Sequence, residues 1–224
     1  GWLVHARQTP LAIETWLPIS AARTPGLLTA WAALVILSSS NAVNLADGLD
    51  GLAGGSVVIA TACLALIAWL TTNFTPQAMG LYVLAAGMLG SMLGFLRFNR
   101  HPARVFMGDT GSLPLGALLG MLALAIGHEL LWVVIGGVFV AEAVSVMLQV
   151  GWYKWRKERL FRCAPLHHHF QFLGWPEHKI VARFWLASLV CAVAALTLVK
   201  FSLRAEPTLD AQRSAAAMTA SRTR

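Results

Sequence analysis

Charged residues are scarce in this chain of 224 residues, and their scarcity excludes an ordinary soluble domain. Asp, Glu, Lys and Arg make up 12% of the sequence, whereas soluble domains average about 25%. Hydrophobic residues make up 57%. This composition indicates an integral membrane protein, so we expect membrane lipids, and no nucleic acid, among its partners.

Cysteine is also rare. Cys63, Cys163 and Cys191 are scattered along the chain, which excludes both a disulfide framework and the spacing of a zinc site. The first residues lack the basic and then apolar layout of a signal peptide, and the chain begins with Gly1 instead of methionine. We therefore expect a fragment or a processed product.

Long apolar runs are what the sequence has in abundance. Most reach the length of about 20 residues that a helix needs to cross the hydrocarbon core. The run at 112–128 is the shortest, and only Gly127, His128 and Glu129 separate it from the next, which favours a tight helical hairpin. We predict an all-α, polytopic membrane helix bundle with six spans near residues 27–46, 52–71, 79–98, 112–128, 129–151 and 180–203.

The net charge of +7 is unevenly distributed. Basic residues gather in the predicted loops 97–111 and 152–179, which the positive-inside rule places in the cytoplasm. With alternating spans, the turn at 47–51 faces the same side. Residues 1–26 are then an external segment, 27–203 form the membrane portion, and the tail 204–224 is expected to be disordered. These assignments predict a membrane protein whose motif-bearing loops share the cytoplasmic face.

The first group of polar residues ends the first apolar run. Asn41, Asn44 and Asp47 recur every three residues and so share one broad helix face. Asp47 and Asp50 flank Gly48, which favours a tight turn that can approach a ligand. Asn41 and Asn44 could instead form interhelical hydrogen bonds, and Asp47 could cap the next helix. Two carboxylates at the membrane edge favour a functional site.

The second group lies between Asn99 and Ser112. Asp109 stands between two glycines, and one carboxylate together with substrate phosphates is a common way to hold Mg²⁺. Thr110 and Ser112 open the next predicted helix, whose first amides would favour a phosphate nearby. The alternative is that Asp109 simply caps that helix.

The third group contains the consecutive histidines His167, His168 and His169. They cannot share one helix face. This favours a loop that turns one or two of them toward a phosphate, and disfavours a helical metal site.

Glu142, near the middle of the fifth predicted span, is a functional candidate because burying a carboxylate there is costly. A structural hydrogen bond to a partner that the sequence does not name is its alternative. The aromatic and basic stretch 152–162 suits a membrane surface.

Together, the three groups resemble the polyprenyl-phosphate N-acetylhexosamine-1-phosphate transferases. The residues that carry the resemblance are Asn41-x-x-Asn44-x-x-Asp47-Gly-x-Asp50-Gly, Phe106-Met-Gly-Asp109-x-Gly-Ser112 and His167-His-His-Phe170. The histidine triplet is most similar to the branch that transfers phospho-MurNAc-pentapeptide from UDP-MurNAc-pentapeptide to undecaprenyl phosphate, with Mg²⁺ as cofactor and UMP as product. That family has ten spans, of which this chain resembles the last six.

The resemblance also implies roles for individual residues. Asp109 would hold Mg²⁺, and the catalytic set would be Asp47, Asp109, His167 and His168. Phe106 would stack on uracil. The other residues expected to bind substrate are Asn41, Asn44, Gly48, Asp50, Asn99, Gln149 and His169. A homodimer is left open, as is the choice between direct transfer and a phosphoryl-enzyme.

One departure from the family pattern shapes these expectations. The family carries an Asp-Asp-x-x-Lys motif on an earlier loop, and no Asp-Asp pair occurs in this chain. We therefore expect a truncated chain that is inactive alone. The alternatives are a sister transferase that uses another UDP-N-acetylhexosamine, an ion pathway or transporter fragment, and a catalytically inactive scaffold. An ion pathway would spread its charges through the membrane depth, whereas most here cluster at one face.

Overall fold

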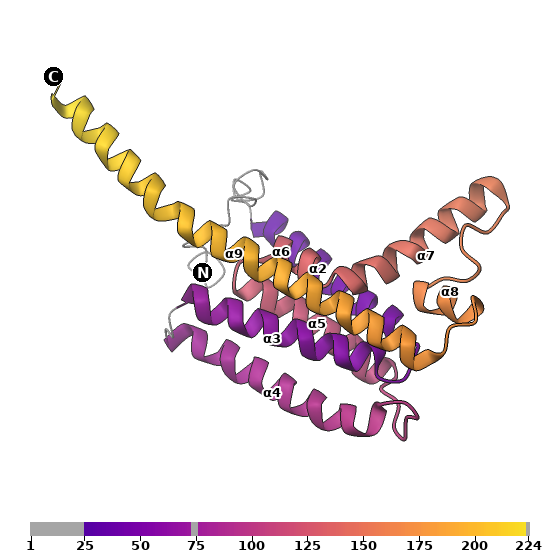
Figure 1. Cartoon of the computed structure of the whole chain (residues 1–224). Coiled ribbons are helices and arrows are strands. Elements are labelled where there is room, and N and C mark those ends of the chain that lie inside the picture. Colours follow the sequence, from indigo (N-terminus) through magenta and orange to yellow (C-terminus); the bar gives the residue numbers. More distant parts are fainter. Residues whose placement is uncertain (1–24, 73–75, 223–224) are drawn as a thin grey trace.

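The computed structural model describes residues 25–72 and 76–222, with residues 204–222 described for the backbone alone. Every regular element in these ranges is a helix (Figure 1). Their bounds are α2 Pro25–Ala46, α3 Leu52–Thr72, α4 Pro76–Asn99, α5 Asp109–Ala125, α6 Glu129–Ile135, α7 Gly137–Arg156, α8 Leu166–Phe172 and α9 Glu177–Arg222. The all-α helix bundle is thus confirmed.

Four helices are long and apolar enough to cross a membrane, and they match four of the predicted spans: Gly26–Ala46, Leu52–Thr72, Ala78–Asn99 and Glu177–Leu203. The predicted span 112–128 corresponds to α5, which has 17 residues and lies at the lower limit of about 17–25 for spanning helices. The expected tight connection after it is present, since α5 ends at Ala125 and α6 begins at Glu129.

The predicted continuous span 129–151 is wrong in one respect. It is broken into α6 and α7, which meet at an angle of 83°. The break falls at Gly136 and Gly137, and a glycine pair is a common cause of a sharp kink. A broken pair counted as one span raises the number of long spans to five. Beyond the kink, α7 leaves the bundle sideways (Figure 1).

The backbone continues as helix through residues 204–222, for which the sequence predicted disorder. This stretch includes the run Ala215-Ala-Ala217, and alanine has the highest helix propensity. The predicted external segment 1–26 lies almost entirely outside the described residues.

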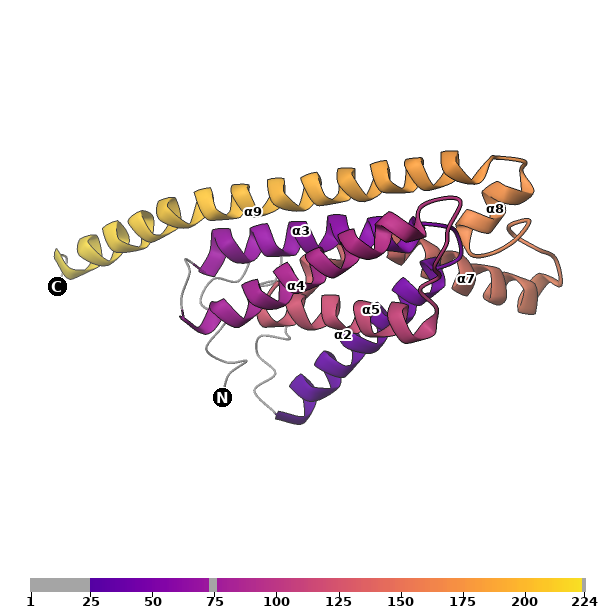
Figure 2. The same cartoon turned by 90° about the horizontal axis from the view of Figure 1, so that it is seen from below.

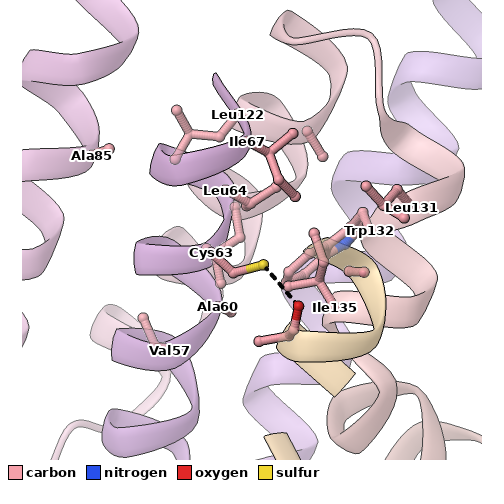
Figure 3. Close-up of a cluster of buried hydrophobic side chains, with 14 of the residues drawn as sticks. Val57, Ala60, Cys63, Leu64, Ile67, Ala85, Leu122, Leu131, Trp132 and Ile135 are labelled. Atoms are coloured by element: carbon pink, nitrogen blue, oxygen red, sulfur yellow. Dashed lines mark hydrogen bonds between the residues drawn. The ribbon is translucent and has the colours of Figure 1, made fainter. Parts of the chain in front are cut away.

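The helix α3 lies at the centre of the bundle. Of the 18 consecutive residues that make the most apolar stretch of α3, 67% are buried, against 17% of the same stretch in each of α2 and α4 and 22% in α9. Figure 3 shows the face of α3 that carries Ala60, Leu64 and Ile67 turned toward Trp132 and Ile135 of α6. The dashed contact there is the thiol of Cys63, which donates to the Ala192 carbonyl at 3.6 Å. The first residues of α3, from Leu52 to Val57, are buried as well, which holds the turn before them in place.

The helices α2 and α5 approach closely through small residues. A Cβ at Gly116 would lie 2.5 Å from the Ser39 carbonyl oxygen, and one at Gly120 would lie 2.9 Å from Ser39 Oγ. Small residues allow such close approach between membrane helices. The hydroxyl of Ser40 donates to the Leu113 carbonyl at 2.9 Å. The end of α2 is therefore held beside the start of α5.

The turn at 47–51, the loop 100–108, α8 and the start of α9 all gather at one end of the bundle (Figure 2). Hydrogen bonds described below join these segments. The motif-bearing loops thus lie together at one end of the bundle, as a common membrane face for them would require.

Candidate active site

The carboxylate of Asp47 lies in the turn between α2 and α3 and faces the start of α5. Burial raises the pKa of Asp47 above its ordinary value, hydrogen bonding from the Gly108 backbone lowers it, and repulsion from the Asp109 carboxylate raises it. The net shift is upward. Two carboxylates from separate segments thus lie close enough to repel each other.

The backbone at Gly108 makes this approach possible. Gly108 has a φ of 63° and stands at the N-cap of α5, in the left-handed region that glycine adopts without steric cost. It turns its backbone toward Asp47, while Asp109 becomes the first residue of the helix. The sequence alternatives in which Asp47 or Asp109 caps a helix receive no support, because neither stands at the residue before its helix.

Asn44 joins the two motifs. Its Nδ2 donates to Asp109 Oδ1 at 2.8 Å and to Ser112 Oγ at 2.9 Å. Ser112 Oγ in turn donates to the Gly108 carbonyl at 3.0 Å. Asn41 behaves differently, since its Nδ2 donates to the Leu37 carbonyl of its own helix. Of the polar face predicted on α2, Asn44 and Asp47 meet the second motif directly.

Asn99 and Asp50 hold the loop after α4 against the turn. The side chain of Asn99 is buried, accepts the Gly51 backbone N–H at 3.1 Å and donates to the Val105 carbonyl at 2.9 Å. The Asp50 carboxylate accepts the Ala103 backbone N–H at 2.9 Å. Both residues, which the resemblance assigns to substrate binding, thus also have a structural task at this corner.

Two residues that the sequence did not single out complete this corner. His101 Nδ1 lies 3.2 Å from Asp50 Oδ2 and 3.8 Å from Glu177 Oε2, and Glu177 Oε1 accepts the Asp50 backbone N–H at 2.8 Å. One ligand atom from each of the three side chains lies within 4.8 Å of the others, so this cluster could hold a metal ion. It is distinct from Asp109, where the sequence predicted the metal. No local signal in the sequence links Glu177 to this turn.

The histidine triplet lies on the short helix α8, and the expectation of a loop is wrong. The backbone N–H groups of His168 and His169 donate to the Pro165 carbonyl, which starts the helix. As three consecutive helical residues, the histidines point in different directions. His168 Nδ1 lies 2.7 Å from Gln171 Oε1, and His169 Nδ1 accepts the Arg162 backbone N–H at 3.2 Å.

His167 is the buried member of the triplet, with 1% of its surface exposed. Its Nδ1 lies 3.1 Å from Oε1 of Glu142. The partner of Glu142, which the sequence left unnamed, is therefore His167. The other end of the ring packs on Gly48, where a Cβ would collide with it.

The side chain of Gln149 is held by hydrogen bonds, whereas that of Phe106 is largely exposed. The Gln149 side chain donates to the Phe161 carbonyl and accepts the backbone N–H groups of Leu160 and Phe161, so it braces the loop before α8. The Phe106 side chain is 75% exposed. Its ring is open to a stacking partner, as a base-binding role would require.

Comparisons with known proteins agree with the motifs. The family model described as glycosyl transferase family 4 matches residues 9–127. A phospho-N-acetylmuramoyl-pentapeptide-transferase of Leptospira biflexa is 51% identical over 180 residues, which cover 76% of this chain and 49% of that protein. Proteins of the same name from Koribacter versatilis and Chlamydia trachomatis are each 52% identical, over 76% and 75% of this chain and 48% and 49% of their own lengths.

The chain spans about half the length of the curated relatives that it matches. The matching family model covers more than half of the chain and includes the turn with Asp47 and the helix start with Asp109. On this evidence the chain belongs to glycosyl transferase family 4.

Proposed function

We propose that this chain carries part of the active site of a phospho-N-acetylmuramoyl-pentapeptide transferase. The reaction would move phospho-MurNAc-pentapeptide from its UDP carrier to undecaprenyl phosphate and release UMP, at the cytoplasmic face of the bacterial inner membrane. The single observation that carries the proposal is the meeting of Asp47 and Asp109, joined through Asn44, in a chain half identical to relatives of that name.

The charges of the reactants explain why such a site suits the reaction. A lipid phosphate and a sugar-nucleotide pyrophosphate are both anionic, so their reaction needs charge neutralisation and alignment more than covalent help. Bound Mg²⁺ would supply that neutralisation by holding phosphate oxygens. Asp109, with Asp47 beside it, is the residue that would hold it.

The carboxylates fit a divalent cation. Asp47 and Asp109 repel each other, and neither forms an ion pair with a basic side chain within the described part of the chain. A cation between them would remove this repulsion, which adds to the effect of burial in raising the pKa of Asp47. The hydrogen bond from Asn44 keeps Asp109 turned toward this position, in the manner of outer-shell partners at metal sites.

Asp47 itself is suited to accept a proton from the attacking phosphate, because a raised pKa brings a carboxyl nearer the working pH. Nucleophilic attack by the same carboxylate is the alternative and would leave a phosphoryl-enzyme that can be trapped. We assign the uracil to the exposed ring of Phe106. His168, Asp50 and Gly48 would complete the substrate contacts.

The test is Mg²⁺-dependent release of UMP from UDP-MurNAc-pentapeptide in membranes supplied with undecaprenyl phosphate. It compares the full-length gene product with its Asp109→Ala variant and with Glu158→Ala, which removes an exposed carboxylate in the loop after α7. We expect activity that only Asp109→Ala abolishes. Absence of UMP release from the wild-type gene product would refute the pentapeptide substrate, and other UDP-N-acetylhexosamines would then be tried in the same assay.

A further inference from the structure

A buried carboxylate and a buried histidine form a pair next to the active-site turn. Glu142 lies in α7 with 0% of its surface exposed, and His167 lies in α8 with 1% exposed. Oε1 of Glu142 accepts the His167 backbone N–H at 3.2 Å and lies 3.1 Å from His167 Nδ1. One oxygen atom thus fixes both the backbone and the ring of this histidine.

The contact with the carboxylate fixes the orientation of the His167 ring. An ionised carboxylate can only accept, so Nδ1 of His167 carries the proton in this contact. The opposite nitrogen, Nε2, is buried and has no hydrogen-bond partner among the described residues. The ring is therefore held with Nδ1 toward Glu142 and Nε2 toward Gly48.

The pair also leaves a second polar atom unsatisfied. Glu142 Oε2 is buried and has no partner within the described part of the chain. Buried polar groups in folded proteins are almost always paired, and each exception calls for an explanation. A chain selected for stability alone would gain by filling this space with apolar side chains. The pair is therefore better explained by a task than by its contribution to the fold.

The position of the ring indicates the task. The Nε2 end of His167 packs directly on Gly48, and a Cβ at that residue would collide with the ring. Gly48 is the neighbour of Asp47 in the turn between α2 and α3. The ring therefore limits how far the turn can move toward α8, and the position of Asp47 depends on it.

We propose that Glu142 is a positioning residue, which holds His167 against Gly48 and so sets the place of the Asp47 carboxylate. The inference rests on the proposed function for the role of Asp47. It assigns His167 a supporting part, in place of the direct contact with substrate that the sequence predicted, and leaves contact with phosphates to the more exposed His168.

The experiment uses the full-length gene product and three variants. Glu142→Leu removes the acceptor, and Glu142→Gln keeps an oxygen that can accept both hydrogen bonds. Ser145→Ala is the matched control, because Ser145 is buried on the same helix and donates only to the Glu142 carbonyl of that helix. The readouts are kcat and KM for UDP-MurNAc-pentapeptide, and the NMR signals of the His167 ring nitrogens and the Asp47 carboxyl carbon.

For Glu142→Leu we expect kcat to fall about 10- to 100-fold, the usual effect of losing a residue that orients an active-site group. KM should change less than about threefold, since the uracil contacts are elsewhere. The Asp47 carboxyl signal should move, and the His167 nitrogens should no longer show a single tautomer. Glu142→Gln and Ser145→Ala should stay close to wild type in all readouts.

An unchanged Asp47 signal in Glu142→Leu would overturn the inference, as would a kcat that falls equally in Glu142→Leu and Ser145→Ala. The NMR readout also separates the two proposals. If the wild-type gene product releases no UMP while the Asp47 signal still responds to Glu142→Leu, the proposed function fails and the positioning role stands.

Discussion

Replacing Gly48 with alanine is a direct test of the contact between the active-site turn and α8. The added Cβ would lie 2.9 Å from Cε1 and 3.1 Å from Cδ2 of His167, and would collide with Nε2. The ring cannot swing away without breaking the contact of its Nδ1 with Glu142 Oε1. Either the turn or α8 must therefore move.

Overpacking of this kind costs about 1–3 kcal/mol of unfolding free energy. For a chain of this size each kcal/mol shifts the Tm by about 2–4 °C, so the Tm of Gly48→Ala should fall by about 2–12 °C. The assay is thermal unfolding of the detergent-solubilised chain, followed by circular dichroism. Gly87→Ala is the matched control, since Gly87 lies inside α4 with nothing within 4 Å of its Cβ position. There alanine should stabilise the helix by up to about 1 kcal/mol.

A double variant identifies the cause of any loss. In a His167→Ala background the ring is absent, so Gly48→Ala should destabilise the chain less than it does in wild type, by a coupling energy of about 0.5–3 kcal/mol. An unchanged or higher Tm for Gly48→Ala would contradict the predicted contact. So would a loss of the same size in the His167→Ala background.

Three further outcomes are expected. Burial raises the pKa of Asp47, so the folded chain favours the protonated carboxyl. The stability that this carboxyl contributes is fully present below its unfolded pKa and is lost as pH rises through its folded pKa. Asp47→Asn should therefore raise the Tm at pH 7 and leave it unchanged near pH 3, and a lower Tm at pH 7 would contradict this. Gln149→Ala removes three hydrogen bonds to the loop before α8 and should speed limited trypsin cleavage there, whereas equal cleavage rates would deny its bracing role. Asn44→Ala should lower Mg²⁺-dependent UMP release about 10- to 100-fold, and Asn41→Ala, whose amide bonds only within α2, should lower it less.

The helices that the sequence predicted well are those in which one physical requirement dominates. Runs of apolar residues long enough to cross a bilayer end close to the observed bounds of α2, α3 and α4. The kink between α6 and α7 was missed because apolar residues continue on both sides of Gly136. A glycine pair permits a bend, and only packing against other helices makes it 83°.

The site was predictable where its residues follow short motifs, and unpredictable where it depends on distant pairs. The sequence placed Asp47 and Asp109 in turns with glycine, and the structure brings these turns together. The sequence did not identify His167 as the partner of Glu142, because the two are 25 positions apart. It also overlooked Glu177, whose partner Asp50 is 127 positions away. Such pairs depend on the tertiary fold, which local spacing does not encode. The histidines were expected in a loop because three consecutive residues cannot share one helix face, but the structure places them on a helix of seven residues, where they point in different directions.

The close packing of α2 on α5 has a consequence for mutational scanning. An alanine at Gly116 would meet the backbone of Ser39 and Ser40, which has no rotamer to change. The two helices would have to separate, and with them the amide of Asn44 and the carboxylate that it holds. A scan that scores only survival would record Gly116 as intolerant, although it lies about two helical turns from Asp109 along α5. Intolerance at that position would then measure the spacing between two helices, and it should not be taken as a sign of chemistry.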